Sequence, residues 1–294
     1  MGWRCGGLRW GEAGPSLVWR RDGDGARRES TLLYGRDLAF RAVGARVCAG
    51  ARGKACPLRA LVAARSTGGQ CPECARLDRA RSVAADTVAD DPRTFRVYLA
   101  WFGPGMVKVG ITAEERGPAR LLEQGAVVFS WLGRGPLMAA RRTEELLRTA
   151  LGVPDRIPYA RKRGARTALP GSAERAAEIG GTHARAVALE GWPQSLERAE
   201  FVAVDHAEAF GLDGLAPAAG VVTELVDGGL VAGRLTAAAG PDLYLATAGG
   251  GLVVLDTRLM SGWELVAAPT GSPVSVPVRE IRDERADGVQ DGLF

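Results

Sequence analysis

The middle of the chain has the clearest alternation of apolar and polar positions. Residues 96–102 (RVYLAWF) and 106–112 (MVKVGIT) are rich in β-branched and aromatic side chains, as strands usually are. Residues 103–105 between them are Gly-Pro-Gly, and short glycine-containing connections are typical of β-hairpins. Residues 126–131 (AVVFSW) form a third run of this kind. The pattern therefore predicts a hairpin followed by a third strand.

Two helical segments accompany these strands. Residues 118–124 begin with Pro118 and end before Gly125, which are residue types that commonly open and close helices. From Met138 to Leu151, apolar residues recur at helical spacing. The order strand, strand, helix, strand, helix predicts an α+β domain with a small three-stranded antiparallel sheet flanked by helices.

The segments on either side of this block have a different pattern. Short strand-like runs joined by glycine-rich turns occupy the first 47 residues and recur from about residue 221 to 269. Near the cysteines, Pro57 precedes apolar residues at helical spacing, which predicts a short helix there. The predicted regions are an N-terminal β-rich and four-cysteine region (1–95), the central domain with a basic extension (96–166), a helical and loop connector (167–220), a β-rich C-terminal region (221–274) and a flexible tail (275–294).

Composition narrows the class of protein. The 294 residues are 46% hydrophobic and 24% charged, which is an ordinary balance for a globular protein. No apolar run approaches the roughly 20 residues needed to cross a bilayer. The first residues, MGWRC, lack the apolar core of a signal peptide. We therefore expect a cytoplasmic protein without membrane association, in which cysteines more often bind metals or do chemistry than form disulfides.

Four of the five cysteines lie in one short segment, at Cys48, Cys56, Cys71 and Cys74. The last two form a C-x2-C pair, whose tight turn presents two thiolates to one ion. Zinc takes four such ligands in a tetrahedron, and Cys48 and Cys56 complete the set. The alternatives are a redox pair or unrelated buried cysteines, but a thioredoxin-like pair follows a strand in a βαβ unit, which is not evident here. The spacing predicts a structural Zn²⁺ site with no open position for catalysis.

The central block carries residues that match a known motif one by one. Tyr98 lies on the first predicted strand, Lys108 on the second, Arg120 on the first helix and Glu144 on the second helix. In this order the block resembles the GIY-YIG nuclease superfamily. Lys108 stands where the family has a second tyrosine, and Gln124 replaces a frequent histidine. The resemblance implies a GIY-YIG-like sheet flanked by helices and an endonuclease activity.

The resemblance also implies a role for each residue. Tyr98 would take the proton of an attacking water, and Arg120 would stabilise the charge that develops on the phosphate. Glu144 would hold a catalytic Mg²⁺ or Mn²⁺ ion, with the adjacent Glu145 as the alternative ligand. Lys108 is a candidate for the role of the missing tyrosine. Each residue also has a plain structural explanation, since a tyrosine in an apolar strand is commonly a core residue.

The wider layout resembles a second family. The four-cysteine segment, the run VYLAWFGPGMVKVGIT, the helix ending in LEQGA, residues 152–155 and a late strand at Tyr244 together resemble the bacterial domain-of-unknown-function family numbered 2797. This resemblance covers most of the chain. It implies a layout and carries no activity with it.

Positive charge is concentrated around the central block. The chain has a formal net charge of +4, and residues 97–166 contain twelve Lys and Arg against six Asp and Glu. One stretch without an acid carries five of these charges, at Arg156, Arg161, Lys162, Arg163 and Arg166. Phosphate contacts from such a stretch would give salt-dependent, largely sequence-independent binding, and a solvated basic loop is the alternative. The stretch predicts a nucleic acid, DNA or RNA, as the partner.

These features predict a zinc-containing nucleic-acid-binding protein whose central domain is a divalent-metal-dependent endonuclease. Two alternatives remain open. One is a non-catalytic nucleic-acid or protein interaction module that keeps the nuclease fold and has lost the chemistry. The other is a protein-interaction scaffold in which the β-rich C-terminal region binds the partner.

Overall fold

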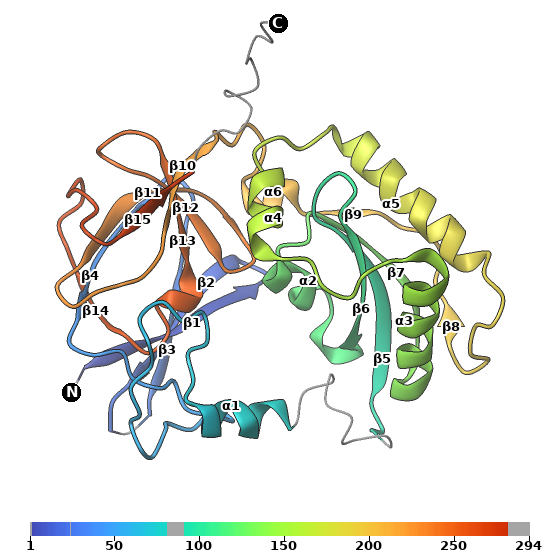
Figure 1. Cartoon of the computed structure of the whole chain (residues 1–294), viewed down its shortest axis with the longest axis horizontal. Helices are drawn as coiled ribbons and strands as arrows, with labels where there is room; N and C mark the ends of the chain where they lie inside the picture. The colour runs from blue at the N-terminus through green and yellow to red at the C-terminus, as the bar shows by residue number, and fades with distance from the viewer. Residues whose placement is uncertain (1, 24, 81–90, 282–294) are drawn as a thin grey trace, which may run out of the picture.

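The computed structural model describes residues 2–23, 25–80 and 91–281, which form two β-sheets and the helices around them (Figure 1). The large sheet has ten strands in the order β15-β10-β13-β12-β11-β4-β14-β1-β2-β3. The second sheet runs β6-β5-β7-β8, and β9 also pairs with β7. The mixture of helices and strands agrees with the predicted α+β class, but both sheets are larger than the three strands expected.

The strands of the large sheet are β1 (Trp3–Gly11), β2 (Gly14–Arg21), β3 (Arg27–Thr31), β4 (Asp37–Val43), β10 (Ala218–Val222), β11 (Leu230–Ala239), β12 (Asp242–Ala246), β13 (Leu252–Asp256), β14 (Glu264–Ala267) and β15 (Val278–Glu280). The second sheet contains β5 (Thr94–Trp101), β6 (Val107–Ala113), β7 (Val128–Pro136), β8 (Glu197–Arg198) and β9 (Val204–Asp205). The helices are α1 (Pro72–Arg79), α2 (Ala119–Gln124), α3 (Leu137–Leu151), α4 (Tyr159–Ala165), α5 (Ser172–Val187) and α6 (Ala207–Phe210), with single turns η1 (Glu114–Arg116) and η2 (Thr257–Leu259).

Early and late parts of the chain build the large sheet together, and Figure 1 shows its early strands in blue and its late strands in orange to red. β4 pairs antiparallel with β11 on one side and β14 on the other, and β14 also pairs with β1. Regions 1–95 and 221–274, which the sequence separates, therefore share one sheet. Hairpins formed within either region leave open strand edges, and pairing across the chain satisfies the backbone groups of those edges.

The predicted tail begins with ordered structure. β15 pairs antiparallel with β10 at one edge of the large sheet, so residues 278–280 form a strand. Val276, just before it, is buried. Residues 282–294 of the predicted tail lie outside the described residues.

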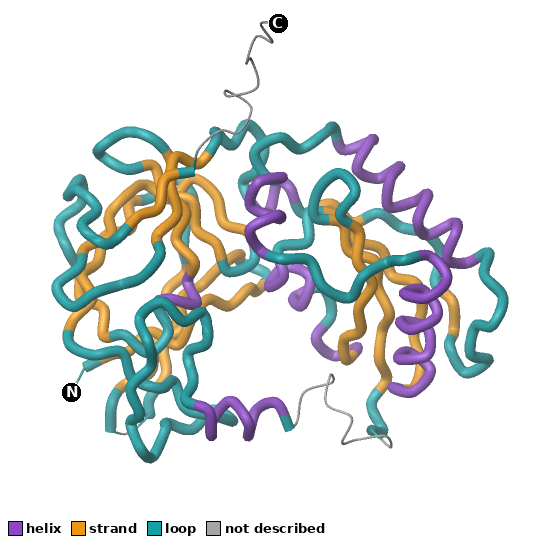
Figure 2. The backbone as a smooth tube through the Cα atoms, viewed as in Figure 1, coloured by secondary structure: helices purple, strands orange, loops and turns teal. Residues whose placement is uncertain are grey.

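The predicted hairpin of the second sheet is confirmed. β5 pairs antiparallel with β6 across the turn at residues 103–105, and its other edge pairs with β7. The connector adds β8 and β9 to the outer edge of β7, which is why this sheet exceeds the prediction. α3 packs against β5, β6 and β7, while α5 packs against β5 and β7. Helices therefore gather around the second sheet and leave the large sheet mostly bare of them (Figure 2).

α2 and α3 form where the sequence predicts them. Gly125 and Gly152 follow their last residues with φ of 69° and 65°, a left-handed conformation that glycine adopts without strain. The helix expected after Pro57 does not form. Leu58 and Leu61 are each 73% exposed there, and Leu61 makes an isolated β-bridge to Val47. Apolar spacing predicts a helix only where a core receives the apolar face, and these leucines have none.

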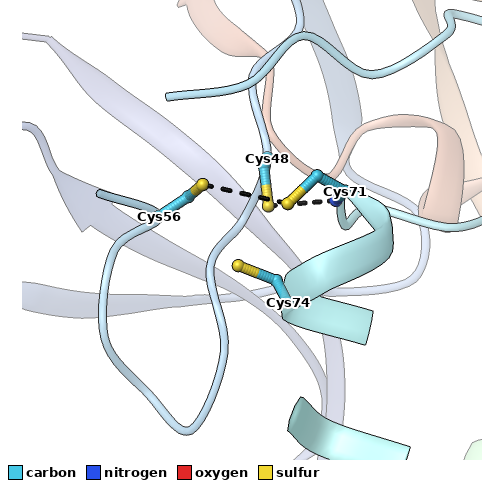
Figure 3. A group of neighbouring side chains, drawn as sticks. All are labelled: Cys48, Cys56, Cys71 and Cys74. Atoms are coloured by element: carbon cyan, nitrogen blue, oxygen red, sulfur yellow. Dashed lines mark hydrogen bonds between the residues drawn. The ribbon is translucent and has the colours of Figure 1, made fainter. Parts of the chain in front are cut away.

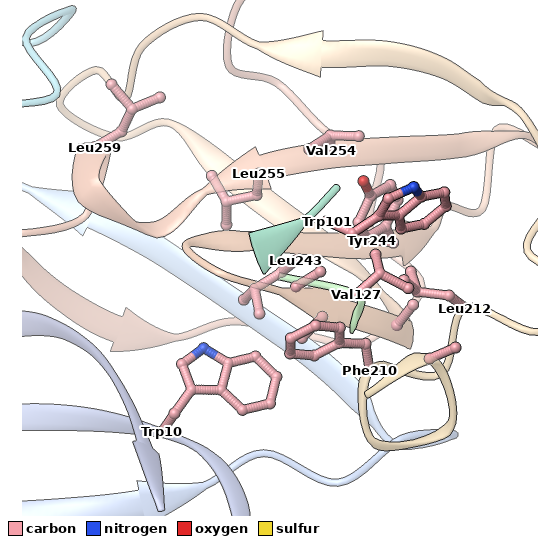
Figure 4. Close-up of a cluster of buried hydrophobic side chains, with 14 of the residues drawn as sticks. Trp10, Trp101, Val127, Phe210, Leu212, Leu243, Tyr244, Val254, Leu255 and Leu259 are labelled. Carbon is pink, nitrogen blue, oxygen red and sulfur yellow. The ribbon is translucent and has the colours of Figure 1, made fainter. Parts of the chain in front are cut away.

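One hydrophobic core joins the two sheets. Trp101 of the second sheet and Tyr244 of the large sheet belong to the same cluster of buried side chains (Figure 4). Trp10 of β1 meets Phe210 of α6 edge-on, with ring centroids 5.0 Å apart. Gly240, in the turn after β11, packs so closely on the end of α2 that an added Cβ would lie 3.0 Å from the Gly125 nitrogen. The second sheet is therefore fixed against the large one. No helix of the described residues is both long and apolar enough to span a membrane.

Candidate metal centre and polar cluster

Four cysteines meet between β4 and α1. The Sγ atoms of Cys48, Cys56, Cys71 and Cys74 all lie within 4.8 Å of one another, and each of these residues is at most 6% exposed. Cys71 sits at the N-terminus of α1 and Cys74 within its first turn, so the C-x2-C pair points both sulfurs to one side (Figure 3). The sequence prediction that these four side chains converge is confirmed.

The geometry fits a tetrahedral ion. Zinc–sulfur bonds of about 2.3 Å in a tetrahedron place sulfurs about 3.8 Å apart, and the Cys56 and Cys71 sulfurs are 4.0 Å apart. The backbone nitrogens of Gly50 and Cys71 donate to the Cys48 sulfur at 3.3 and 3.1 Å. Amide donors of this kind stabilise a thiolate. The centre could hold a metal ion such as zinc. Four thiolates would fill a tetrahedral coordination sphere, so no coordination position would be open to a substrate.

The thiols of this centre differ in their tendency to ionise. Burial raises the pKa of Cys48 and Cys74, because a buried thiolate loses its hydration. The pKa of Cys56 is lowered to about 7, chiefly by the backbone N–H of Ala60. A bound cation would offset the cost of several buried thiolates, which is the arrangement that structural metal sites use.

A second polar cluster forms on the second sheet. Tyr98 comes from β5, Lys108 from β6, Arg120 from α2 and Glu144 from α3. The Lys108 Nζ lies 5.7 Å from the Tyr98 ring centroid. Arg120 and Glu144 both act electrostatically on Tyr98 and on Lys108. The structure therefore brings together the four residues that the motif comparison selected from four separate elements.

Tyr98 is buried, with its hydroxyl held in place. The Gln124 Nε2 donates a 2.8 Å hydrogen bond to the Tyr98 Oη. Gly110, opposite Tyr98 on β6, leaves room for the ring, because a Cβ there would lie 2.5 Å from the Tyr98 Cζ. Burial raises the pKa of the hydroxyl, and the Gln124 hydrogen bond opposes that shift. Gln124, expected to replace a histidine, thus orients the tyrosine.

Lys108 is also buried and less basic than usual. Its Nζ donates to the carbonyl oxygen of Asp155 at 3.3 Å. Burial, followed by the positive charge of Arg120, lowers its pKa to about 8. A lysine of this pKa is partly neutral near neutral pH, and its free amine accepts a proton.

The acidic side of the cluster consists of Glu144 and Asp155. Burial raises the pKa of Glu144, and the negative charge of Asp155 raises it further. The rival Glu145 is exposed and pairs with Arg148 at 2.5 Å. Sequence reasoning missed Asp155. Its position depends on a backbone bond from the Val109 nitrogen to the Pro154 oxygen (3.1 Å), for which the sequence offers no signal.

Arg120 connects this cluster to a cleft between the two sheets. The cleft has a volume of about 350 Å³, and Arg120 and Glu123 of α2 line one side. Tyr159 and Arg258 lie on its wall, and the loop at residues 67–69, between Cys56 and Cys71, borders it too. Arg120 is thus the member of the polar cluster that lines this cleft, and Thr67 and Gly69 are the residues that the cysteine segment contributes to it.

The basic stretch is not the continuous charged surface that the sequence suggests. Lys162 and Arg166 are 3% and 1% exposed, and Arg163 is mostly buried. These three residues lie on or next to α4, which packs between the sheets, so their charges face inward. Only Arg156 and Arg161 of the stretch are exposed.

Arg163 and Arg166 belong to what we call the arginine–aspartate cluster, which consists of these two residues with Arg258, Asp242 and Asp256. Arg163 bonds Asp242 at 2.6 Å and Asp256 at 2.8 Å. Arg166 bonds Asp242 at 2.7 Å, and Arg258 bonds Asp256 at 2.6 Å. The aspartates belong to β12 and β13, so Arg163 and Arg166 anchor α4 to the large sheet. Their partners are 76 to 93 residues away in sequence, which is why the stretch resembles a surface loop.

Comparison with known proteins places the chain in a family. The sequence model of the family described as "Protein of unknown function (DUF2797)" matches residues 35–265. The chain belongs to this family. The DUF2797 match includes the cysteine centre, the whole polar cluster and strands β4 to β13, and it begins after β1–β3. No curated protein and no solved structure matches the chain.

Proposed function

We propose that this DUF2797 protein is a zinc-containing nucleic-acid-binding protein whose second sheet carries a GIY-YIG-like, divalent-metal-dependent nuclease centre. The observation that carries the proposal is the grouping of Tyr98, Lys108, Arg120 and Glu144 on one sheet, with Arg120 also lining the cleft. They arise from four elements spread over 47 residues. Burying the polar groups of a tyrosine, a lysine and a glutamate together costs folding free energy. Clusters of this kind occur mainly at functional sites, where the chemistry needs them.

The residues suit hydrolysis of a phosphodiester. Water attacks the phosphorus, the bond to the leaving oxygen breaks, and the water proton passes to the free amine of Lys108, either directly or through the Tyr98 hydroxyl, which gives up its own proton as it accepts one. Arg120, at the cleft wall, would stabilise the charge that develops on the phosphate oxygens. Glu144, with Asp155, would hold a Mg²⁺ or Mn²⁺ ion, since this ion is usually bound by one or two carboxylates together with substrate phosphate. The ion would supply Lewis-acid neutralisation of the phosphate charge.

The distribution of charge supports an anionic partner. Residues 1–166 contain 30 Lys and Arg against 16 Asp and Glu, whereas residues 167–294 contain 8 against 18. The positive part includes the cysteine segment and the polar cluster. Arg156 and Arg161 are the exposed members of the basic stretch, and we assign phosphate contacts to them. Lys162, Arg163 and Arg166 are left out of this assignment because they face inward.

A cleavage assay tests the catalytic part of the proposal. The purified protein is incubated with single- and double-stranded DNA and RNA and with Mg²⁺ or Mn²⁺. We expect metal-dependent cleavage, and we expect Tyr98→Phe, Arg120→Ala and Glu144→Gln each to reduce the rate by a factor of 100 or more, as is usual for catalytic groups.

Glu145→Gln is the matched control, because Glu145 neighbours Glu144 but pairs with Arg148 at the surface. It should cleave like the wild-type protein. Cleavage that survives all three substitutions would place the active site elsewhere. A protein that binds nucleic acid and cuts no substrate would instead be a binding module, a role with which the 2% exposure of Tyr98 is compatible.

Binding is tested separately from cleavage. Arg156→Ala and Arg161→Ala together should weaken DNA binding and lower the slope of log affinity against log salt by up to about two charges. Arg234→Ala, on β11, removes an arginine that is 66% exposed on the large sheet and serves as the control. Equal salt dependence in the double variant and the wild type would contradict the assigned contact surface.

A further inference from the structure

A second cavity lies between α4 and the large sheet. Its volume is about 480 Å³. Close-packed interiors leave few voids larger than a water molecule, whereas ligand pockets have roughly 300 to 1,000 Å³. None of Tyr98, Lys108, Arg120 and Glu144 lines it. The cavity is therefore the size of a small-molecule site and separate from the polar cluster.

Most of the side chains that line this cavity are apolar and small. Val221, Tyr244 and Val254 face it from the large sheet, and residues 217–219 (Pro-Ala-Ala), where β10 begins, line one side. Gly164 faces it from within α4, and a Cβ added there would meet nothing within 4 Å. Glycine inside a helix costs about 1 kcal/mol relative to alanine. The helix thus carries its smallest residue where a longer side chain would fill the space.

Positive charge adjoins the apolar walls. Arg163 and Arg279 both line the cavity. The arginine–aspartate cluster behind Arg163 contains three guanidinium groups and two carboxylates, which leaves one positive charge uncompensated. Within the described chain, Arg163 Nε and two nitrogens of Arg166 have no hydrogen-bond acceptor. Buried positive charge in excess is stabilised by an anion placed beside it.

We propose that this cavity binds a small molecule in which an apolar body carries one acidic group, either a carboxylate or a phosphate. The apolar body would lie against Val221 and Val254, and the acidic group would lie between Arg163 and Arg279. The site makes no use of the polar cluster, so it stands whether or not the protein cleaves nucleic acid.

The probe for this site is 8-anilinonaphthalene-1-sulfonate, an aromatic anion whose fluorescence rises in an apolar pocket. We expect one equivalent to bind the folded protein. Gly164→Leu places a side chain in the cavity and should weaken binding at least about tenfold. Arg279→Gln removes a charged donor at the rim and should weaken binding by about tenfold. Arg279 is exposed on an edge strand, so this variant tests the site even where Gly164→Leu folds poorly.

Two control variants match these substitutions. Gly181 is a glycine within α5 whose added Cβ also meets nothing within 4 Å, and it lines none of the cavities described. Gly181→Leu and Arg234→Gln should bind the probe like the wild type. Probe binding that is the same in Gly164→Leu, Arg279→Gln and the wild type would overturn the proposal.

Competition identifies the acidic group. Displacement of the probe by octanoate supports a carboxylate ligand, and displacement by adenosine monophosphate supports a phosphate ligand. Inorganic phosphate alone should not displace it, because it has no apolar body. Displacement by inorganic phosphate as effective as by adenosine monophosphate, or failure of both organic competitors, would overturn the proposal.

Discussion

At the scale of single residues, the structure depends on small side chains placed against large ones. Gly110 is the clearest case. Its hydrogen faces the Tyr98 ring, and an added methyl group would lie 2.5 Å from the Tyr98 Cζ. Tyr98 is buried on all sides, so its ring has no free space to move into.

Gly110→Ala is therefore expected to destabilise the protein by about 1–3 kcal/mol, the usual cost of overpacking. Urea denaturation measures the change. Gly11→Ala is the control, since Gly11 also belongs to a strand but an added Cβ there would meet nothing within 4 Å. A Gly110→Ala variant as stable as Gly11→Ala would mean that Tyr98 is not held as the structure has it.

Lys162 is a second residue with a measurable signature. It is 3% exposed, and its Nζ lies 3.7 Å from the Phe102 ring centroid. Burial, with the positive charge of Lys108, lowers its pKa to about 7. An unfolded lysine keeps its proton up to about pH 10.4. Between these two values the unfolded chain binds more protons, so the free energy of unfolding rises with pH in this window.

Lys162→Met removes the cost of burying a charged amine. It is therefore expected to stabilise the protein by about 1–3 kcal/mol at pH 6.5. The gain should shrink as the pH rises from 7 towards 10, because the wild-type lysine then folds in its neutral form. Thermal unfolding at pH 6.5 and 9.5 measures both quantities. A gain that is equal at the two pH values would contradict the lowered pKa.

At the scale of elements, the sequence predicted those helices and turns that residues within the same short segment specify. The hairpin, α2 and α3 are visible because turn residues, glycine stops and apolar spacing act within a few residues. The four cysteines converge for a similar reason, since C-x2-C fixes two ligands locally. Tyr98 and Glu144 were found through a motif. Asp155 was missed, because no residue near it indicates which strand its backbone contacts.

α4 illustrates the opposite case. Five positive charges without an acid predict an exposed stretch, yet Arg163 and Arg166 bond aspartates of β12 and β13. The sequence shows the net charge of a stretch, but it does not show which distant acidic residues pair with that stretch in the folded protein. The same long-range contacts explain why the cavity behind α4 had no signal in the sequence.

The buried ion pairs of α4 should be costly to break. Arg166→Met leaves Asp242, which is fully buried, with one of its two guanidinium partners. We expect a loss of about 3 kcal/mol in the free energy of unfolding, as for other buried pairs deprived of one partner. The control is Arg134→Met, because the pair of Arg134 with Glu197 is exposed to solvent and should contribute much less to the free energy of unfolding. Equal losses in the two variants would contradict the anchoring role of Arg166.

At the scale of the whole molecule, the cysteine segment depends on the large sheet for support. Arg46, which is 3% exposed, donates to the carbonyl oxygens of Ala63 and Ser66 in this segment and of Ser261 beside η2. The segment otherwise has little regular structure before α1. Its order therefore rests on Arg46 and on the cysteine centre.

Metal removal is expected to loosen this segment alone. Treatment with a chelator should raise amide hydrogen exchange across residues 47–79, while β5, β6 and β7 keep their protection. Cys71→Ser should show the same exchange pattern without a chelator, and Cys5→Ser, outside the centre, should lack it. Protection that is unchanged by chelation of stoichiometrically zinc-loaded protein would contradict a folding role for the metal.

The position of β4 has a consequence for synthesis of the chain on the ribosome. Both of its neighbours in the sheet, β11 and β14, are encoded near the other end of the chain. About 190 residues separate the end of β4 from the start of β11, which at 5–20 residues per second is roughly 10 to 40 seconds of translation. During that interval β4 has neither of its partners and β1 lacks β14, while β5, β6 and β7 can already pair with one another. The cysteine segment follows β4 directly in the chain. Binding of a metal ion could therefore order this segment before the large sheet is complete.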